Sequence, residues 1–320
     1  MTEEIRERER EREPVPGGHA LRKLVAAACD GTLSPELAAR FGANLEDWDT
    51  HEVEDFSSAF AGRVQFDGDL SRWDVSRGRS FAHMFDCAWS FRGRGLERWA
   101  VSAAAATNLA YMFDGAASMD ADLSEWDVSR VVSLRNAFRA ARAFRGVGLA
   151  RWDVAQVQDM RGAFSGALSL TADLSRWSTG NVTDMSEMFA RAWAFDRDLS
   201  RWDTRNVRSM ARMFYGASIF NRPLGNWDVG QVEDMREMFA FAAFFDQPLG
   251  DWDVRQVRSA AEMFRDARAF GQSLREWKLP ADADVSDMFA GAERMLLLPR
   301  ALWPPVVTVA PDLCARCEVC

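Results

Sequence analysis

Tryptophan recurs along this chain at a nearly constant interval. Ten of its thirteen tryptophans are separated by 25 to 27 residues: Trp48, Trp73, Trp99, Trp126, Trp152, Trp177, Trp202, Trp227, Trp252 and Trp277. An interval of this size, kept over most of the 320 residues, is typical of a solenoid, because one repeat cannot bury its apolar face alone and stacks on its neighbours. The sequence therefore predicts one continuous array rather than several separate globular domains.

The first half of each repeat has the alternation of a short strand. One copy reads Leu-x-x-Trp-Asp-Thr, in which Trp202 and Thr204 are two residues apart and share one face of an extended chain. Arg201 and Asp203 are then expected to face outward. We predict parallel strands in neighbouring coils, with the tryptophans as a buried ladder along the axis.

The second half of each repeat changes to the spacing of a helix. Met185, Met188 and Phe189 lie at i, i+3 and i+4, which indicates one apolar stripe. An Asp, Asn or Ser precedes the stripe in all ten repeats, and Glu187 follows Asp184 as in a capping box. The expected fold class is an α/β solenoid similar to leucine-rich repeats, with about ten coils of about 25 residues, each a short parallel strand plus a short capped helix.

Four regions follow from the limits of the repeats. Residues 1–18 alternate Glu and Arg before a Pro/Gly segment and predict a charged flexible arm. Residues 19–44 contain two helical patterns and predict a helical N-terminal cap on the first coil. The ten repeats occupy residues 45–295, and residues 296–320 predict a closing segment followed by a cysteine-containing tail.

Charge and hydropathy narrow the possible partners. The chain has 39 basic and 48 acidic residues, which are interspersed, and this argues against a nucleic-acid partner, which would need a concentrated basic face. No stretch approaches the ~20 apolar residues of a membrane span. Residues 3–13 lack the apolar core of a signal peptide, so the sequence favours an intracellular location.

The residue types of an enzyme site are scarce and scattered. His19, His51 and His83 are too few and too far apart for a relay or a metal cluster, and no nucleotide-binding or nucleophile motif is present. The aspartate that follows Trp recurs along the array, which favours a turn-forming role over one catalytic pair. These residues are Asp49, Asp74, Asp127, Asp153, Asp203, Asp228 and Asp253. We expect no catalysis and no cofactor.

The C-terminal cysteines have a spacing that some metal sites use. Cys314, Cys317 and Cys320 form a C-x-x-C-x-x-C run. A complete zinc site needs a fourth ligand, and none is adjacent. We therefore predict a tail with free thiols, with a metal site as the weaker alternative.

The repeat resembles a known family. Leu174-Ser-Arg-Trp177 followed by Asn181-Val-Thr-Asp-Met-Ser-Glu-Met-Phe189 is close to the pattern of the BspA-like leucine-rich repeats, the DUF285 repeats of bacterial surface proteins and mycoplasma lipoproteins. The resemblance extends over about residues 45–295. It implies a binding or adhesion surface without catalytic residues.

A noncatalytic protein-interaction scaffold is the leading functional hypothesis, and a secreted or cell-surface adhesin is the alternative. The outward strand positions are expected to form a concave face that is basic in the middle coils and prefers an acidic partner segment, because arginine pairs well with carboxylates. The candidate ligand-binding residues are Arg151, Arg176, Ser178, Arg201 and Arg205. The competing interpretation is a solvated charge strip. Trp89 and Trp193, the two tryptophans between repeats of the ladder, are the next candidates.

Overall fold

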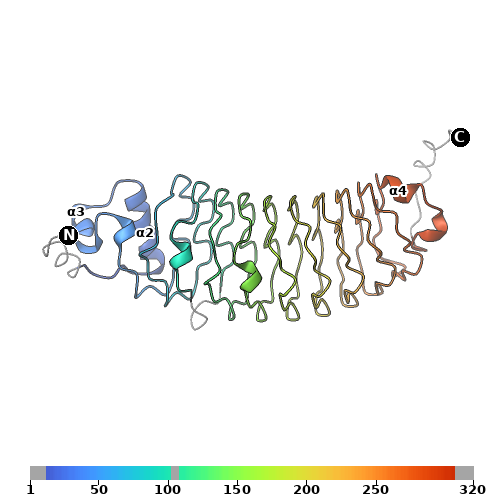
Figure 1. The fold of residues 1–320 in the computed structure, drawn as a ribbon, viewed down its shortest axis with the longest axis horizontal. Coiled ribbons are helices and arrows are strands. Elements are labelled where there is room, and N and C mark those ends of the chain that lie inside the picture. The colour runs from blue at the N-terminus through green and yellow to red at the C-terminus, as the bar shows by residue number, and fades with distance from the viewer. Residues whose placement is uncertain (1–11, 102–107, 307–320) are drawn as a thin grey trace.

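The computed structural model describes residues 12–101 and 108–306 as one elongated stack of coils (Figure 1). Helices α2 (Gly18–Cys29) and α3 (Pro35–Phe41) lie at the N-terminal end, and the short helix α4 (Glu293–Leu296) lies at the other end. A single hydrophobic cluster runs from Val15 to Trp303. The predicted repeat solenoid is confirmed.

The tryptophans form the predicted buried ladder. All ten are between 1% and 4% exposed. Thr204 is also buried, while Arg201 is exposed, so the inward and outward positions are those that the alternation predicts. The rings of Trp177 and Trp202 stack with their centroids 6.2 Å apart and their planes 3° from parallel.

Each tryptophan also makes a polar contact that periodicity does not reveal. The indole N–H of Trp202 donates to the carbonyl oxygen of Leu174 in the preceding coil, at 2.9 Å. The nine tryptophans after the first all donate to the leucine of the preceding coil in this way, and Trp48 donates to Gly42. Because the indole joins a large apolar ring to a donor that phenylalanine lacks, the contact explains why Phe does not replace it.

The predicted capped helices are wrong. Residues 186–191 form consecutive turns, and from Met185 onward alternate N–H groups bond to different partners. Met185 and Glu187 donate to carbonyls of the next coil, at 3.0 and 2.8 Å, while Met188 donates to Met185 within its own coil, at 3.2 Å. Apolar residues at i, i+3 and i+4 therefore face the core of a stacked turn rather than one side of a helix.

Backbone conformation shows why a helix cannot form there. Glu187 and Arg191 have φ of 60° and 56°, and a positive φ falls at the same two places in all ten coils. A residue in this left-handed conformation ends a right-handed helix. Gly166 and Gly216 occupy the second of these places, where glycine carries no steric cost.

The parallel pairing lies elsewhere in the coil than predicted. Nine single-residue parallel bridges link consecutive coils through the residue before the apolar stripe, from Asp55–Ser80 to Ser259–Asp284. Within the described coils, no continuous strand forms at the Trp-Asp-Val segment. The residues predicted as helix caps are therefore the bridging residues, and Asp184 accepts the N–H of Ser186 at 2.8 Å in a local turn.

Short 3-10 turns directly precede four tryptophans: Trp48, Trp99, Trp152 and Trp303. They are η1 (Leu45–Asp47), η2 (Leu96–Arg98), η3 (Leu149–Arg151) and η4 (Arg300–Leu302). Gly95 and Gly148 open η2 and η3 with φ of 92° and 96°, and a Cβ at either place would lie within 2.3 Å of a backbone nitrogen of the preceding coil. Only glycine fits at these two positions, because any Cβ would collide with the backbone of the preceding coil.

The described ends pack on the array. Leu21, Leu24 and Val25 of α2 are buried, and Ser34 caps α3 by accepting the N–H of Leu37 at 3.3 Å. In the described part of the predicted arm, residues 12–18, Val15 is buried and donates to Asp49 at 2.8 Å, so this part is bound to the first coil rather than free.

The C-terminal segment completes the stack beyond the tenth coil. The N–H of Leu274 donates to Leu302 at 2.8 Å, and Trp303 packs 5.1 Å from Phe289, between ring centroids. Cys314, Cys317 and Cys320 lie outside the described residues. No helix in the part of the chain that the structure describes has both the length and the apolar character needed to cross a bilayer.

Candidate functional site

The predicted arginines form a column on the outside of the coils. Arg151, Arg176 and Arg201 each come directly before a buried tryptophan, so their side chains point to solvent, and all three are exposed. Arg151 lies 3.6 Å from Glu125 in an exposed ion pair. Among the residues that the structure describes, no carboxylate lies within ion-pair distance of Arg176 or Arg201, so these two carry the uncompensated charge of the column.

Arg205 differs from the other arginines of the predicted site. Its guanidinium lies 2.7 Å from the Asp203 carboxylate, and this hydrogen bond raises the pKa of Arg205 and lowers the pKa of Asp203. The pair leaves little net charge for a partner. Ser178 is exposed and stands where the neighbouring coils have Asp153 and Asp203, so the coil between them lacks the carboxylate.

The aspartates that follow the tryptophans have the predicted turn-forming role. In each of the seven repeats the carboxylate accepts the backbone N–H two residues later, at 2.9–3.3 Å. Hydrogen bonds from the side chain and backbone of Ser76 lower the pKa of Asp74, for example. The backbone of the turn therefore occupies these carboxylates.

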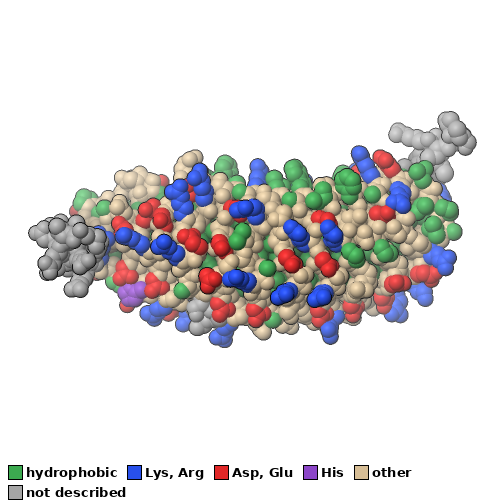
Figure 2. Space-filling model, viewed as in Figure 1, with side chains coloured by type: hydrophobic (Ala, Val, Ile, Leu, Met, Phe, Trp, Pro, Cys, Tyr) green, Lys and Arg blue, Asp and Glu red, His purple; other side chains and the backbone are tan. Residues whose placement is uncertain are grey.

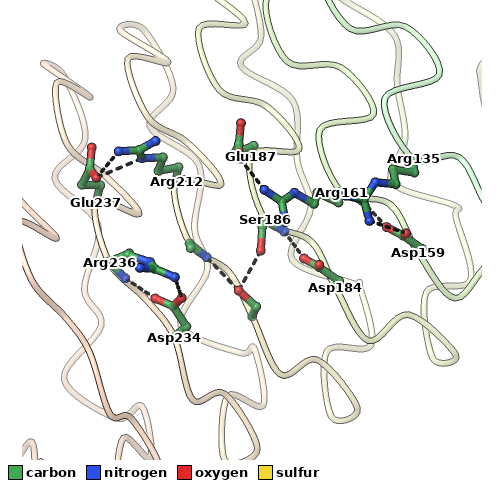
Figure 3. A network of polar contacts seen from close by, with 12 residues as sticks. Arg135, Asp159, Arg161, Asp184, Ser186, Glu187, Arg212, Asp234, Arg236 and Glu237 are labelled. Atoms are coloured by element: carbon green, nitrogen blue, oxygen red, sulfur yellow. Dashed lines mark hydrogen bonds and ion pairs between the residues drawn. The ribbon is translucent and has the colours of Figure 1, made fainter. Parts of the chain in front are cut away.

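A second polar face lies beside the parallel bridges and is shown in Figure 3. Arg161 lies 3.1 Å from Glu187 in the next coil, and the Arg212 Nε donates to Glu237 at 2.9 Å. Hydroxyls join adjacent coils too, since the Oγ atoms of Ser186 and Ser209 are 2.7 Å apart. Glu187, predicted to close a capping box, pairs with an arginine instead, as Glu237 does. Because charges of both signs are matched across coils, this face offers little net charge to a partner.

A cavity of about 490 Å³ lies between the end of α2 and the first coil. Cys29, Arg63 and Phe66 are among its lining residues, and the Arg63 guanidinium is 2.8 Å from Asp30. Burial raises the pKa of the Cys29 thiol. The thiol is therefore protonated at neutral pH and is a poor nucleophile.

The other described thiol is similarly inactive. A hydrogen bond with Asp86, together with burial, raises the pKa of Cys87 to about 11. Asp86 also binds His83 at 2.9 Å, so this carboxylate lowers the acidity of the thiol rather than activating it. Within residues 12–101 and 108–306, no group of His, Cys, Asp and Glu side chains is arranged to hold a metal ion.

Trp89 and Trp193 lie outside the buried ladder, at 59% and 55% exposed. Near Trp193 the structure brings together side chains that sequence reasoning missed. Ile219, Phe241 and Phe244 in the next two coils are 44%, 40% and 63% exposed. Figure 2 shows hydrophobic side chains along the upper margin of the molecule, between arginines. We call Trp193, Ile219, Phe241 and Phe244 the aromatic edge.

The stacked coils and their buried ladder define a solenoid repeat protein. The family model described as "Mycoplasma protein of unknown function, DUF285" matches residues 36–118, 107–221 and 193–297. The chain belongs to the DUF285 family, and the resemblance drawn from its repeats is confirmed.

Comparison with solved structures and curated sequences adds little to the family assignment. One similar chain is a leucine-rich repeat protein from Bacteroides ovatus, with 9% identity, a TM-score of 0.24, and coverage of 64% of this chain and 67% of that chain. A likeness at this level carries no argument about function. The comparison with curated proteins produced no match.

Proposed function

We propose that this protein is a noncatalytic protein-interaction scaffold. The observation that carries the proposal is the separation of roles within each coil: ladders of buried rings maintain the stack, while side chains that the core does not use cover the outside. Such a surface can vary without loss of the fold, as in other repeat proteins that bind partners along an extended face. The protonated thiols and backbone-bound carboxylates support the absence of catalysis.

The arginine column is the first proposed binding face. Arg176 and Arg201 are exposed in successive coils and have no described ion-pair partner, while Ser178 between them replaces a carboxylate. An acidic segment laid across these coils would pair with both guanidinium groups. Arg151 and Arg205 flank this pair and contribute less charge, because Glu125 and Asp203 are close to them.

Charge reversal at the centre of the column tests this proposal. We expect full-length protein to recover specific partners from lysate of its own cells, and Arg176→Glu with Arg201→Glu to lose them. Lys23→Glu with Arg130→Glu changes the net charge equally at exposed residues away from the column and is the matched control. Recovery of no specific partner would contradict the scaffold function. Unchanged recovery by the column variant would contradict only this binding face.

The family resemblance favours one other candidate, an adhesin-type ligand-binding protein at the cell surface. An adhesin would use the same outer surface, so the two functions differ in location rather than in chemistry. Protease treatment of intact cells separates them: an adhesin is digested, while an internal scaffold is protected until the cells are broken.

A further inference from the structure

The aromatic edge is not needed to build the coils that carry it. At the position of Trp193 other coils have Ala117 and Ala243, and at the position of Phe244 they have Ala143 and Ala269. The backbone contact between coils is the same with either type of residue: Phe244 donates to Ser218 at 3.1 Å, and Ala143 donates to Ala117 at 3.0 Å. The exposed rings are therefore additions to a turn that forms without them.

Phe241 is present despite a backbone cost. Its φ is 60°, a conformation that a bulky side chain adopts unfavourably. Glycine fills the same position in half of the coils, as Gly62, Gly115, Gly166, Gly216 and Gly291. Cys87, Ala140, Arg191 and Asp266 adopt the same conformation in the remaining coils, so what distinguishes Phe241 is its large apolar side chain. Phe241 remains 40% exposed, which leaves it available to a ligand.

A cation borders the edge. The Arg191 guanidinium lies over the Tyr215 ring, 5.5 Å from its centroid, and the Tyr215 ring meets Phe241 edge-on at 5.3 Å. Arg191 is exposed, and no carboxylate of the described residues lies within ion-pair distance of it. The aromatic contact orients the guanidinium beside the apolar surface and leaves its hydrogen-bond donors open.

The size of the edge limits the kind of partner. The exposed fractions of its four side chains correspond to an apolar area on the order of 400 Å², from the usual area of such residues. A patch of this size is as large as the largest on typical monomers, where it is often functional. It is about half of the ~800 Å² that each partner contributes to a stable protein–protein interface. A short segment fits this area better than a second copy of the chain.

We propose that the aromatic edge docks a short peptide segment that presents an aromatic or aliphatic side chain next to a carboxylate. The apolar side chain packs on Trp193 and Phe244, and the carboxylate pairs with Arg191. This inference rests on the proposed scaffold function and adds a docking surface outside the arginine column. The two surfaces lie at different positions of the coil, so one can fail without the other.

Selection from a displayed library of short random peptides tests the proposal with a defined probe. We expect the full chain to enrich peptides with a large apolar residue close to Asp or Glu. Trp193→Ala with Phe244→Ala should weaken binding of a selected peptide by about tenfold or more, as for central aromatic contacts. Both substitutions introduce the residue that other coils carry at these positions, so the fold is retained.

Two further variants make the test specific. Trp89→Ala removes an equally exposed tryptophan at the equivalent position of a distant coil and should leave the affinity unchanged. Arg191→Glu should change the preference of the selected peptides from acidic to basic residues, and its backbone conformation is one that Glu187 and Glu237 already adopt.

Several outcomes would overturn the inference. Failure to enrich any peptide, or enriched peptides that bind the Trp193/Phe244 variant as tightly as the unmodified protein, would remove the edge as a peptide site. Loss of binding only in the Arg176/Arg201 variant would support the scaffold function and assign it to the arginine column. Binding to an oligosaccharide array that depends on Trp193, without peptide binding, would replace the peptide with a glycan.

Discussion

Trp202 and Trp193 lie in neighbouring coils but in opposite environments, at 3% and 55% exposed. Trp202 stacks between Trp177 and Trp227, with ring centroids 6.2 and 6.4 Å away, and its N–H reaches a carbonyl of the preceding coil. Trp193 has none of these stacking partners among the described residues. Tryptophan therefore stabilises the stack in one column and is available to a ligand in another.

Removal of a ladder ring should have the largest effect. Trp202→Ala takes one ring out of the buried stack and should lower the free energy of unfolding by about 3–5 kcal/mol, as expected for a core tryptophan. Urea unfolding followed by circular dichroism measures the change. A midpoint equal to that of the unmodified protein would mean that Trp202 does not support the stack.

Replacement of Trp202 by a smaller ring without a donor tests the fit of the ring and the indole hydrogen bond together. Trp202→Phe keeps an aromatic side chain in the column but removes one of the two hydrogen bonds that the Leu174 carbonyl accepts, while the bond from the Trp177 N–H, at 3.1 Å, remains. We expect a loss of about 1–3 kcal/mol, from the lost hydrogen bond and from the space that the smaller ring leaves in the core. Unfolding of Trp202→Leu in parallel provides the comparison without an aromatic ring. Equal stability of Trp202→Phe and unmodified protein would show that the indole contact adds nothing.

Truncation at the edge should have the smallest effect on folding. Trp193→Ala should change the free energy of unfolding by less than about 0.5 kcal/mol, since Trp193 is 55% exposed and alanine occupies its place in other coils. Trp89→Ala provides the matched measurement in the second coil. Destabilisation of Trp193→Ala similar to that of Trp202→Ala would make the edge structural and remove the basis for peptide docking.

The repeat fold could be predicted because burial has a visible period. The chain places Trp, Met and Phe at the same points of every repeat, and stacking is the arrangement in which all of them leave water. The helix within each repeat could not be predicted correctly. Apolar residues at i, i+3 and i+4 satisfy either one helical face or consecutive turns, and the choice depends on where the backbone N–H groups find acceptors.

The candidate sites could be predicted from the sequence to different degrees. The exposure of Arg176 and Arg201 follows from their position next to a buried tryptophan. The pairing of Arg205 with Asp203 depends on a side-chain conformation that the pattern does not specify. The aromatic edge was indicated only through Trp193. Ile219, Phe241 and Phe244 resemble core residues in composition, and the signal that singles them out is that other coils have alanine or glycine at those positions.

The repeat pattern alone predicts that the chain stacks, which residues face inward and where each coil begins, because periodic burial of large side chains has one solution in a solenoid. The backbone conformation of each coil depends instead on contacts between coils. Met185 and Glu187 find their acceptors in the next coil, and Trp202 finds Leu174 in the preceding one. These partners lie about one coil away along the chain, and proximity across that distance exists only after the coils have stacked.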